Sequence, residues 1–176
     1  MKKDLVIFDG SNFYHGAKRL SPRTHLTDFN YRKFAEEVAK NKNIEIEYCV
    51  GEIKQNQRHQ KSYKLYANQQ ALFYNLQKQN IEIKKGFILY SSLSYHEKGV
   101  DVQIALDIAI GALKNKYRKC YIISSDTDIL PAILVAKDED KEIIYCGFDK
   151  AISRMMKARC PATICIKKEM IKKFSK

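Results

Sequence analysis

The chain has 176 residues, of which 45% are hydrophobic and 11% aromatic, enough for one soluble domain with a buried core. Its 32 Lys and Arg residues outnumber its 20 Asp and Glu residues, and the formal net charge of +12 favours a polyanionic partner, above all nucleic acid. No apolar stretch approaches the length of a membrane span, so we expect no membrane-spanning segment.

Cysteine usage indicates a reducing compartment. The five cysteines are an odd number without a C-x-x-C pair, and three lie in or beside apolar runs, which predicts buried thiols rather than disulfides or a zinc site. The first apolar run reaches Asp9 too soon for a secretory signal peptide. We therefore expect a cytoplasmic protein.

Strand and helix patterns alternate along the first half of the chain. In chain order they predict a strand at 5–8, a helix or turn at 11–20, a helix capped by Thr27 or Asp28, a strand at 44–50, a loop at 51–57, a helix at 58–79 and a strand at 81–90. The helix at 58–79 has a basic first part and carries tyrosines. That pattern fits a solvated helix end or a rim on which a nucleic acid strand could stack.

The second half continues the alternation. Its patterns predict a polar loop at 91–98, a helix at 100–113, a strand at 120–124, a helix at 131–137, a strand at 143–146, a helix at 151–158 and a strand at 163–166. The helix at 100–113 is apolar nearly all round, so we expect it to be buried against the sheet. The whole pattern predicts one three-layer α/β/α domain with a mainly parallel sheet at residues 1–166, followed by a basic tail at 167–176.

Carboxylates follow two of the predicted strands. Asp9 ends the first strand, and Asp126 and Asp128 lie on the loop that leaves the strand at 120–124. Open parallel sheets bind ligands at the carboxyl ends of their strands. If these two strands are neighbours, the three carboxylates and Asn12 converge, which is unfavourable unless a cation neutralises them.

A fourth carboxylate, Asp101, opens the helix at 100–113. Taken singly, Asp101 and Asp128 have a simpler interpretation as helix N-terminal carboxylates, which contribute about 0.3–1 kcal/mol. Asp9 has the same alternative. The hypothesis of a site therefore depends on convergence of the four side chains.

Oxygen-rich clusters of this kind suit Mg²⁺ or Mn²⁺, and a metal-activated water can attack a phosphodiester. Lys98 could contact a phosphate beside Asp101. Asn12, Ser11, Ser124 and Ser125 could orient metal, water or phosphate, although each of them also has a purely structural interpretation. No Walker-type loop and no G-x-G-x-x-G motif are present, so nucleotide-driven and dinucleotide chemistry have little support.

Three motifs carry a family resemblance: FDGSNFY at 8–14, KGVDVQIALDIAIGA at 98–112 and YIISSDTDILPAI at 121–133. They resemble, in the same order, the NYN domain of the LabA-like branch of the PIN-like nuclease superfamily, over roughly Leu5 to Ile166. The resemblance implies a PIN-like, Rossmann-like fold and a Mg²⁺- or Mn²⁺-dependent endoribonuclease. The motif carboxylates would be Asp9, Asp101, Asp126 and Asp128, with Asn12 as their polar companion.

The family pattern also has an acid at Asp107, which lies about 120° round the helix from Asp101. A direct metal role and a buried, hydrogen-bonded support role both stay open for it. Two positions depart from the family: Ser125 stands where glycine is usual, and residues 158–161 lack the acid that often ends the last helix.

Two other functions compete with a nuclease. A non-catalytic PIN-like module would bind RNA or a protein without cleaving, although a binder of polyanions gains nothing from four carboxylates. The loop from Asp126 to Asp128 also faintly resembles the nucleophile loop of haloacid-dehalogenase-like phosphatases, which normally lies on the first strand. The sequence leaves open whether the chain forms a homo-oligomer or has a protein partner.

Overall fold

The computed structural model describes residues 2–53, 60–91 and 94–175. Within them, seven strands form one sheet in the order β4-β3-β2-β1-β5-β6-β7. Neighbouring strands are parallel, except that β3 and β4 are antiparallel. The strands are β1 (Asp4–Asp9), β2 (Ile44–Glu52), β3 (Glu82–Ser91), β4 (Ser94–Lys98), β5 (Lys119–Ile123), β6 (Glu142–Phe148) and β7 (Ala162–Ile166).

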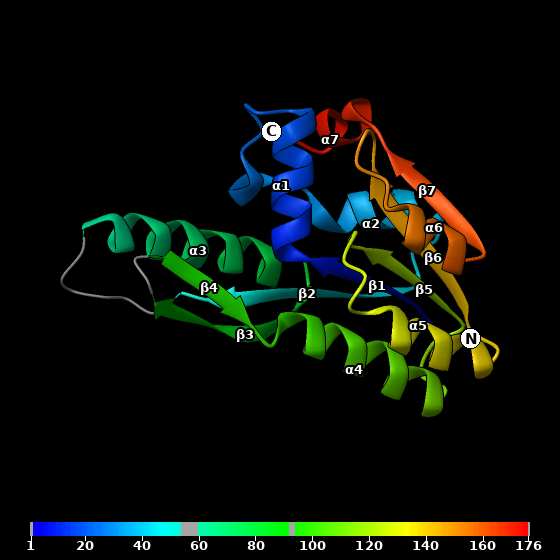
Figure 1. Ribbon diagram of the computed structural model, residues 1–176. Helices are drawn as coiled ribbons and strands as arrows, with labels where there is room; N and C mark the ends of the chain where they lie inside the picture. The colour runs from blue at the N-terminus through cyan, green and yellow to red at the C-terminus, as the bar shows by residue number, and fades with distance from the viewer. Residues whose placement is uncertain (1, 54–59, 92–93, 176) are drawn as a thin grey trace.

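Helices cover both faces of the sheet, as Figure 1 shows. One face carries α1 (Gly10–Leu20), the 3₁₀ turn η1 (Leu26–Asp28), α2 (Tyr31–Ala39), α3 (Gln60–Lys78) and α7 (Lys168–Lys173). The other face carries α4 (Val100–Leu113), α5 (Leu130–Asp138) and α6 (Arg154–Arg159). The predicted three-layer α/β class with a mainly parallel sheet is confirmed.

Each face of the sheet has its own core, because side chains of a strand alternate between the two faces. The core under α1 and α2 is aromatic and centres on Phe8, whose ring lies 5.2 Å from that of Phe13 and 5.9 Å from that of Tyr48. The core under α4 and α5 is mainly aliphatic and includes Ile7 and Ile122. The central strand β1 is therefore buried on both faces, which fixes the position of Asp9 at its end.

The helix α4 is only half buried. Ile104 and Ile108 are fully buried in the core, whereas Val102, Leu106 and Leu113 are 62%, 48% and 60% exposed. The prediction that this helix is buried against the sheet is correct for one face and wrong for the other.

The structure differs from the predictions at an edge strand and at a helix cap. The segment predicted as a polar loop at 91–98 contains β4, in which Lys98 pairs with Phe87 of β3. Gly86 permits the close approach, because a Cβ there would lie 2.6 Å from the carbonyl oxygen of Lys98. The cap of α2 is Asn30, whose side chain accepts the N–H of Lys33 at 3.0 Å, and neither Thr27 nor Asp28 caps this helix.

The basic end of the chain packs onto the domain. Ile171 of α7 is fully buried, and the ring of Phe174 lies 5.8 Å from that of Phe34 in the aromatic core. Gly51 and Glu52, the first residues of the loop predicted at 51–57, belong instead to β2. Residues 54–57 of that loop and the predicted helix residues 58 and 59 lie outside the described residues. In the described part of the chain, no helix is long and apolar enough to cross a membrane.

The cysteines are free thiols. Four of them are buried and Cys165 is half-buried, which confirms the prediction of buried thiols for those four. Burial raises the pKa of Cys49 and of Cys146 well above the ordinary value of a thiol. These sulfur atoms are therefore poor nucleophiles.

Candidate active site

Strands β1 and β5 are parallel neighbours, with Leu5 opposite Cys120 and Phe8 opposite Ile123. Asp9, the last residue of β1, and Ser124, which follows β5, therefore leave the sheet side by side. The condition on which convergence of the carboxylates depended, that the two strands are neighbours, is thus met, and the start of α1 lies next to the loop that leads into α5 (Figure 1).

Asp9 is the best-fixed carboxylate of the site, with 2% of its surface exposed. Its Oδ1 accepts the N–H of Asn12 at 3.0 Å, and its Oδ2 accepts the Asn12 amide and the Ser124 hydroxyl, each at 2.7 Å. Asp9 thus caps α1, as its simpler interpretation predicted. Burial raises the pKa of Asp9 above its ordinary value, the hydrogen bonds oppose this rise, and the charge of Asp126 adds to it.

The loop after β5 is tied to Asp9 by side chains of both strand ends. The N–H of Asp126 donates to the Ser124 hydroxyl at 3.1 Å, and the N–H of Ser125 donates to the Asn12 side-chain oxygen at 3.2 Å. The N–H of Asp128 donates to Oδ1 of Asp126 at 2.9 Å. Ser124 and Asn12 thus connect β1 by hydrogen bonds to the loop after β5, which we call the acidic loop because it carries Asp126 and Asp128.

The Ser125 side chain is held away from this network. Its hydroxyl forms a hydrogen bond of 2.9 Å with the Tyr145 hydroxyl and donates to the carbonyl of Ala151 at 3.3 Å. Tyr145 in turn accepts the N–H of Ser153 at 2.9 Å. The segment between β6 and α6 therefore accommodates a side chain where the resembled motif usually has glycine.

Asp101 lies in the first turn of α4, where it is exposed. Burial of part of the carboxyl raises its pKa, and the negative charges of Asp126, Asp9 and Asp128 raise it further. The N-cap of α4 is Gly99 and that of α5 is Ile129, and neither makes a side-chain cap. Neither Asp101 nor Asp128 is thus an N-cap residue, but Asp101 lies in the first turn of α4, where the helix dipole favours a carboxylate, so its simpler interpretation stays open. The charges of Asp9, Asp126 and Asp128 act on Asp101, and we call these four acids the negative region.

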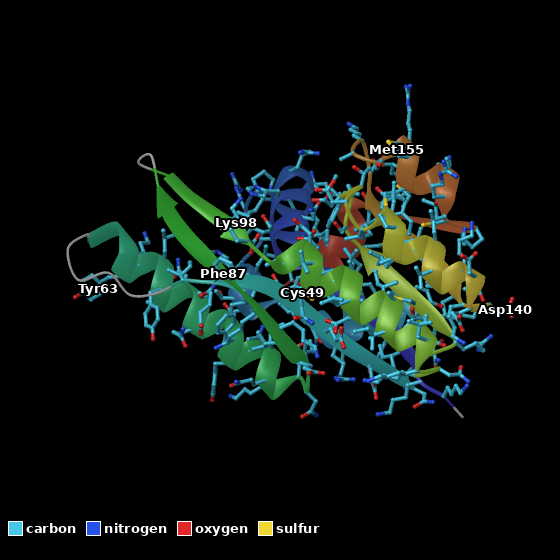
Figure 2. The ribbon with its side chains drawn as sticks, turned by 60° about the horizontal axis from the view of Figure 1, so that its bottom comes forward. Cys49, Tyr63, Phe87, Lys98, Asp140 and Met155 are labelled. Atoms are coloured by element: carbon cyan, nitrogen blue, oxygen red, sulfur yellow. The ribbon has the colours of Figure 1, made fainter. Side chains whose placement is uncertain are left out.

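Glu97 is a further acid beside the negative region that sequence reasoning missed. It accepts the N–H of Gly51, and burial together with the charges of Asp9 and Asp101 raises its pKa. Sequence reasoning placed it in the polar loop predicted at 91–98, which gave no signal for a strand. Lys98 follows as an exposed residue three positions before Asp101, and Figure 2 shows it near the start of α4.

Two other predicted residues, Ser11 and Asp107, make no hydrogen bond to these carboxylates within the described part of the chain. Ser11 is half-buried in the first turn of α1. Asp107 accepts the Gln103 amide at 2.8 Å, and its charge raises the pKa of Glu47 and of Cys49. The structure thus groups Asp107 with Glu47 of β2.

The carboxylate oxygens of the site are ligands of the chemical type that binds a divalent cation. Among the described residues, no group of three or more His, Cys, Asp or Glu side chains is placed to hold a metal ion. Mg²⁺, however, usually binds through one or two carboxylates, several waters and substrate phosphate, and carboxylate oxygen is its preferred ligand. Partial burial, followed by the charges of Asp126, Asp9 and Asp128, raises the pKa of Asp101, and a bound cation would offset these charges.

A mainly parallel sheet between helices, with carboxylates at the ends of its central strands, is consistent with a PIN-like domain. The sequence model of the NYN domain family matches residues 5–167, and the chain therefore belongs to the NYN domain family. NYN domains are generally nucleases, so membership indicates a nuclease that acts on nucleic acid.

One solved structure shares this fold. It is the crystal structure of a protein of unknown function from Vibrio parahaemolyticus, with a TM-score of 0.65 and 18% sequence identity over 94% of this chain and 93% of that chain. At this identity the likeness shows a common fold alone. No curated protein matches the chain.

Proposed function

We propose that the protein is a divalent-metal-dependent endoribonuclease of the LabA-like branch. Its active site would consist of Asp9, Asp101, Asp126 and Asp128, which would hold the metal for hydrolysis of a phosphodiester bond. The observation that carries the proposal is the hydrogen-bonded tie between two strand ends: Asp9 accepts the Ser124 hydroxyl at 2.7 Å, and the same hydroxyl oxygen accepts the N–H of Asp126 at 3.1 Å. This tie brings the carboxylate at the end of β1 beside the acidic loop after β5. Acids that converge where parallel strands end, with the exposed Asp101 near enough for their charges to raise its pKa, are typical of a site that needs a cation.

The residues divide the work by their exposure. Asp9 is buried and held by Asn12 and Ser124, so it provides a fixed point for the site. Asp101 and Asp128 are exposed, so they can reach metal, water and phosphate from the solvent side. When bound, Mg²⁺ or Mn²⁺ would polarise the phosphate and make a water more acidic.

RNA is the proposed substrate class. The net charge of +12 attracts a phosphate backbone, and exposed Lys98 adds a cation beside the acidic region. The free, buried cysteines support a reducing compartment, so we propose a cytoplasmic enzyme.

The test is cleavage of labelled single-stranded RNA, hairpin RNA and single-stranded DNA with Mg²⁺ or Mn²⁺, with and without chelator. Asp126→Asn keeps the size of the side chain and should abolish cleavage. Asp138→Asn removes an equivalent charge at the far end of α5 and should leave cleavage unchanged. Equal cleavage by wild type and Asp126→Asn would identify a contaminating nuclease and refute the assignment.

A non-catalytic PIN-like module is the second candidate, and one observation favours it. In the described residues the carboxylates do not form a ready-made group of three metal ligands. Such a module would keep its affinity for RNA or protein in chelator and would cut RNA with no divalent ion. The same assay, with binding measured alongside, therefore separates the two functions.

A further inference from the structure

A cavity lies beside α1, on the face of the sheet that carries this helix. It lies between α1, η1, α3 and the end of β2, with a volume of about 370 Å³. Small-molecule sites usually occupy about 300–1,000 Å³ and have mainly apolar walls. In this cavity Ile53, Leu65 and Leu72 form an apolar wall. Tyr14, which is 49% exposed, also lines the cavity.

Two contacts connect this cavity to the acidic site. Tyr48, which lines the cavity, packs so closely on Gly10 that a Cβ there would lie 2.7 Å from its ring. Gly10 directly follows Asp9. On the β2 side, the carbonyl of Gly51 accepts the Gln69 amide of the cavity at 2.8 Å, while its N–H donates to Glu97 of the acidic region.

The polar groups of the cavity suit a neutral ring better than a phosphate. The ammonium of Lys18 donates to the carbonyls of Pro22 and Thr24 at 3.1 and 2.8 Å, so it is already engaged with the loop between α1 and η1. Asn68 offers an exposed amide. An exposed tyrosine beside an amide can stack on a nucleobase and hydrogen-bond its edge.

The geometry of α1 relates this cavity to the site of cleavage. Tyr14 follows Asn12 by two residues, so the two side chains project about 200° apart round the helix. Asn12 contacts the acidic loop, and Tyr14 lines the cavity. An RNA strand whose backbone lies at the exposed acids Asp101 and Asp128 would reach the cavity by crossing α1 beside Gly10, which Tyr48 of the cavity contacts.

We propose that this cavity, which we call the base pocket, binds one unpaired nucleobase of the RNA whose backbone lies at the acidic site. The inference rests on the proposed function and deepens it, because a paired base cannot enter the pocket. Single-stranded RNA or an unpaired loop is therefore the substrate class.

The first test measures binding of labelled single-stranded RNA and of the matching duplex in chelator, so that no cleavage occurs. Tyr14→Ala should weaken single-strand binding about tenfold, which corresponds to about 1.4 kcal/mol. It should leave duplex binding unchanged. Tyr14→Phe, which keeps the ring, and Tyr74→Ala, which removes a 60% exposed tyrosine elsewhere on α3, should bind as wild type does.

The second test moves a single abasic nucleotide along the single-stranded RNA. For wild type, one position should weaken binding about as much as Tyr14→Ala does, and Tyr14→Ala should be insensitive to that position. Equal effects of Tyr14→Ala and Tyr74→Ala, an equal loss on duplex RNA, or no RNA binding by wild type would overturn the base pocket.

The two proposals can fail separately. Base-dependent binding without metal-dependent cleavage would support the pocket and refute the nuclease. Cleavage by wild type whose rate and position are unchanged in Tyr14→Ala would refute the pocket and leave the nuclease.

Discussion

The folded protein disfavours the ionised form of the Glu47 carboxyl in β2. The side chain of Glu47 is 13% exposed, and its Oε2 is buried without a hydrogen-bond partner among the described residues. Lys84 lies 3.8 Å away but makes a shorter contact, of 2.7 Å, with Glu82. Burial and the charge of Asp107 raise the pKa of Glu47 to about 7, from an ordinary value of 4.5.

We predict that Glu47→Gln stabilises the protein at neutral and alkaline pH. Between pH 4.5 and about 7 the folded state binds more protons than the unfolded state, so the free energy of unfolding falls as the pH rises through this window. The full difference in pKa corresponds to about 3 kcal/mol. Partial solvent access reduces this, and we expect about 2 kcal/mol above pH 7.

The assay is urea denaturation of wild type and variant at pH 4.5, 6 and 8, with the midpoint compared at constant slope. The increase in the free energy of unfolding of Glu47→Gln over wild type should be near zero at pH 4.5 and largest at pH 8. Glu45→Gln is the matched control, because Glu45 lies two residues earlier on the same face of β2, is 58% exposed and pairs with Lys3 at 3.3 Å. It should change stability by less than about 0.5 kcal/mol at each pH. A Glu47→Gln variant that is less stable at pH 8, or equally shifted at all three pH values, would refute the reasoning.

Three further predictions follow from the contacts of the site, the charge and the thiols. Ser124→Ala removes a donor to buried Asp9 and should lower the free energy of unfolding by about 1–3 kcal/mol in the same titration; an unchanged midpoint would contradict the network. The logarithm of RNA affinity should fall linearly with the logarithm of salt concentration, and a flat response would exclude phosphate contacts as its source. In the folded protein, a thiol reagent should label half-buried Cys165 before buried Cys49 and Cys146, whereas equal rates would contradict their burial.

The placement of Asp9 and of the loop after β5 at one edge of the sheet could be predicted because its signals are local, whereas the sequence left open that β1 and β5 are neighbours. Each strand is an apolar run that ends at a polar turn, and parallel strands bring such turns to one edge of the sheet. The strand β4 could not be predicted in this way. It is the edge strand of the sheet, and its pairing depends on the close approach that Gly86 permits from β3.

The start of α2 shows the same limit on a smaller scale. Thr27, Asp28 and Asn30 are all good capping residues, so the sequence alone does not choose between them. Burial of Leu26 and Phe29 decides the choice, since it folds 26–28 into a 3₁₀ turn and leaves Asn30 as the cap. Tertiary packing therefore moves the helix start by two or three residues.

The acidic residues of α4 show why spacing alone does not assign a site. Asp101 and Asp107 belong to one motif, yet Asp101 feels the charges of Asp9, Asp126 and Asp128, whereas Asp107 acts on Glu47. The effect of Asp107 on Glu47 acts between α4 and β2, which α3, β3 and β4 separate in the chain. A contact between such distant segments has no local signal in the sequence.

Mutual repulsion of carboxylates is thus not sufficient to identify an active site, because it occurs in both places. The two differ in access: Asp101 is exposed at the carboxyl edge of the sheet, whereas Glu47 is largely buried between β2 and α4. Neutralising either acid should relieve repulsion and increase stability. If the proposed function is correct, Asp101→Asn should lose cleavage and Glu47→Gln should retain it, so stability and activity measured on the same two variants distinguish a functional acid from a structural one.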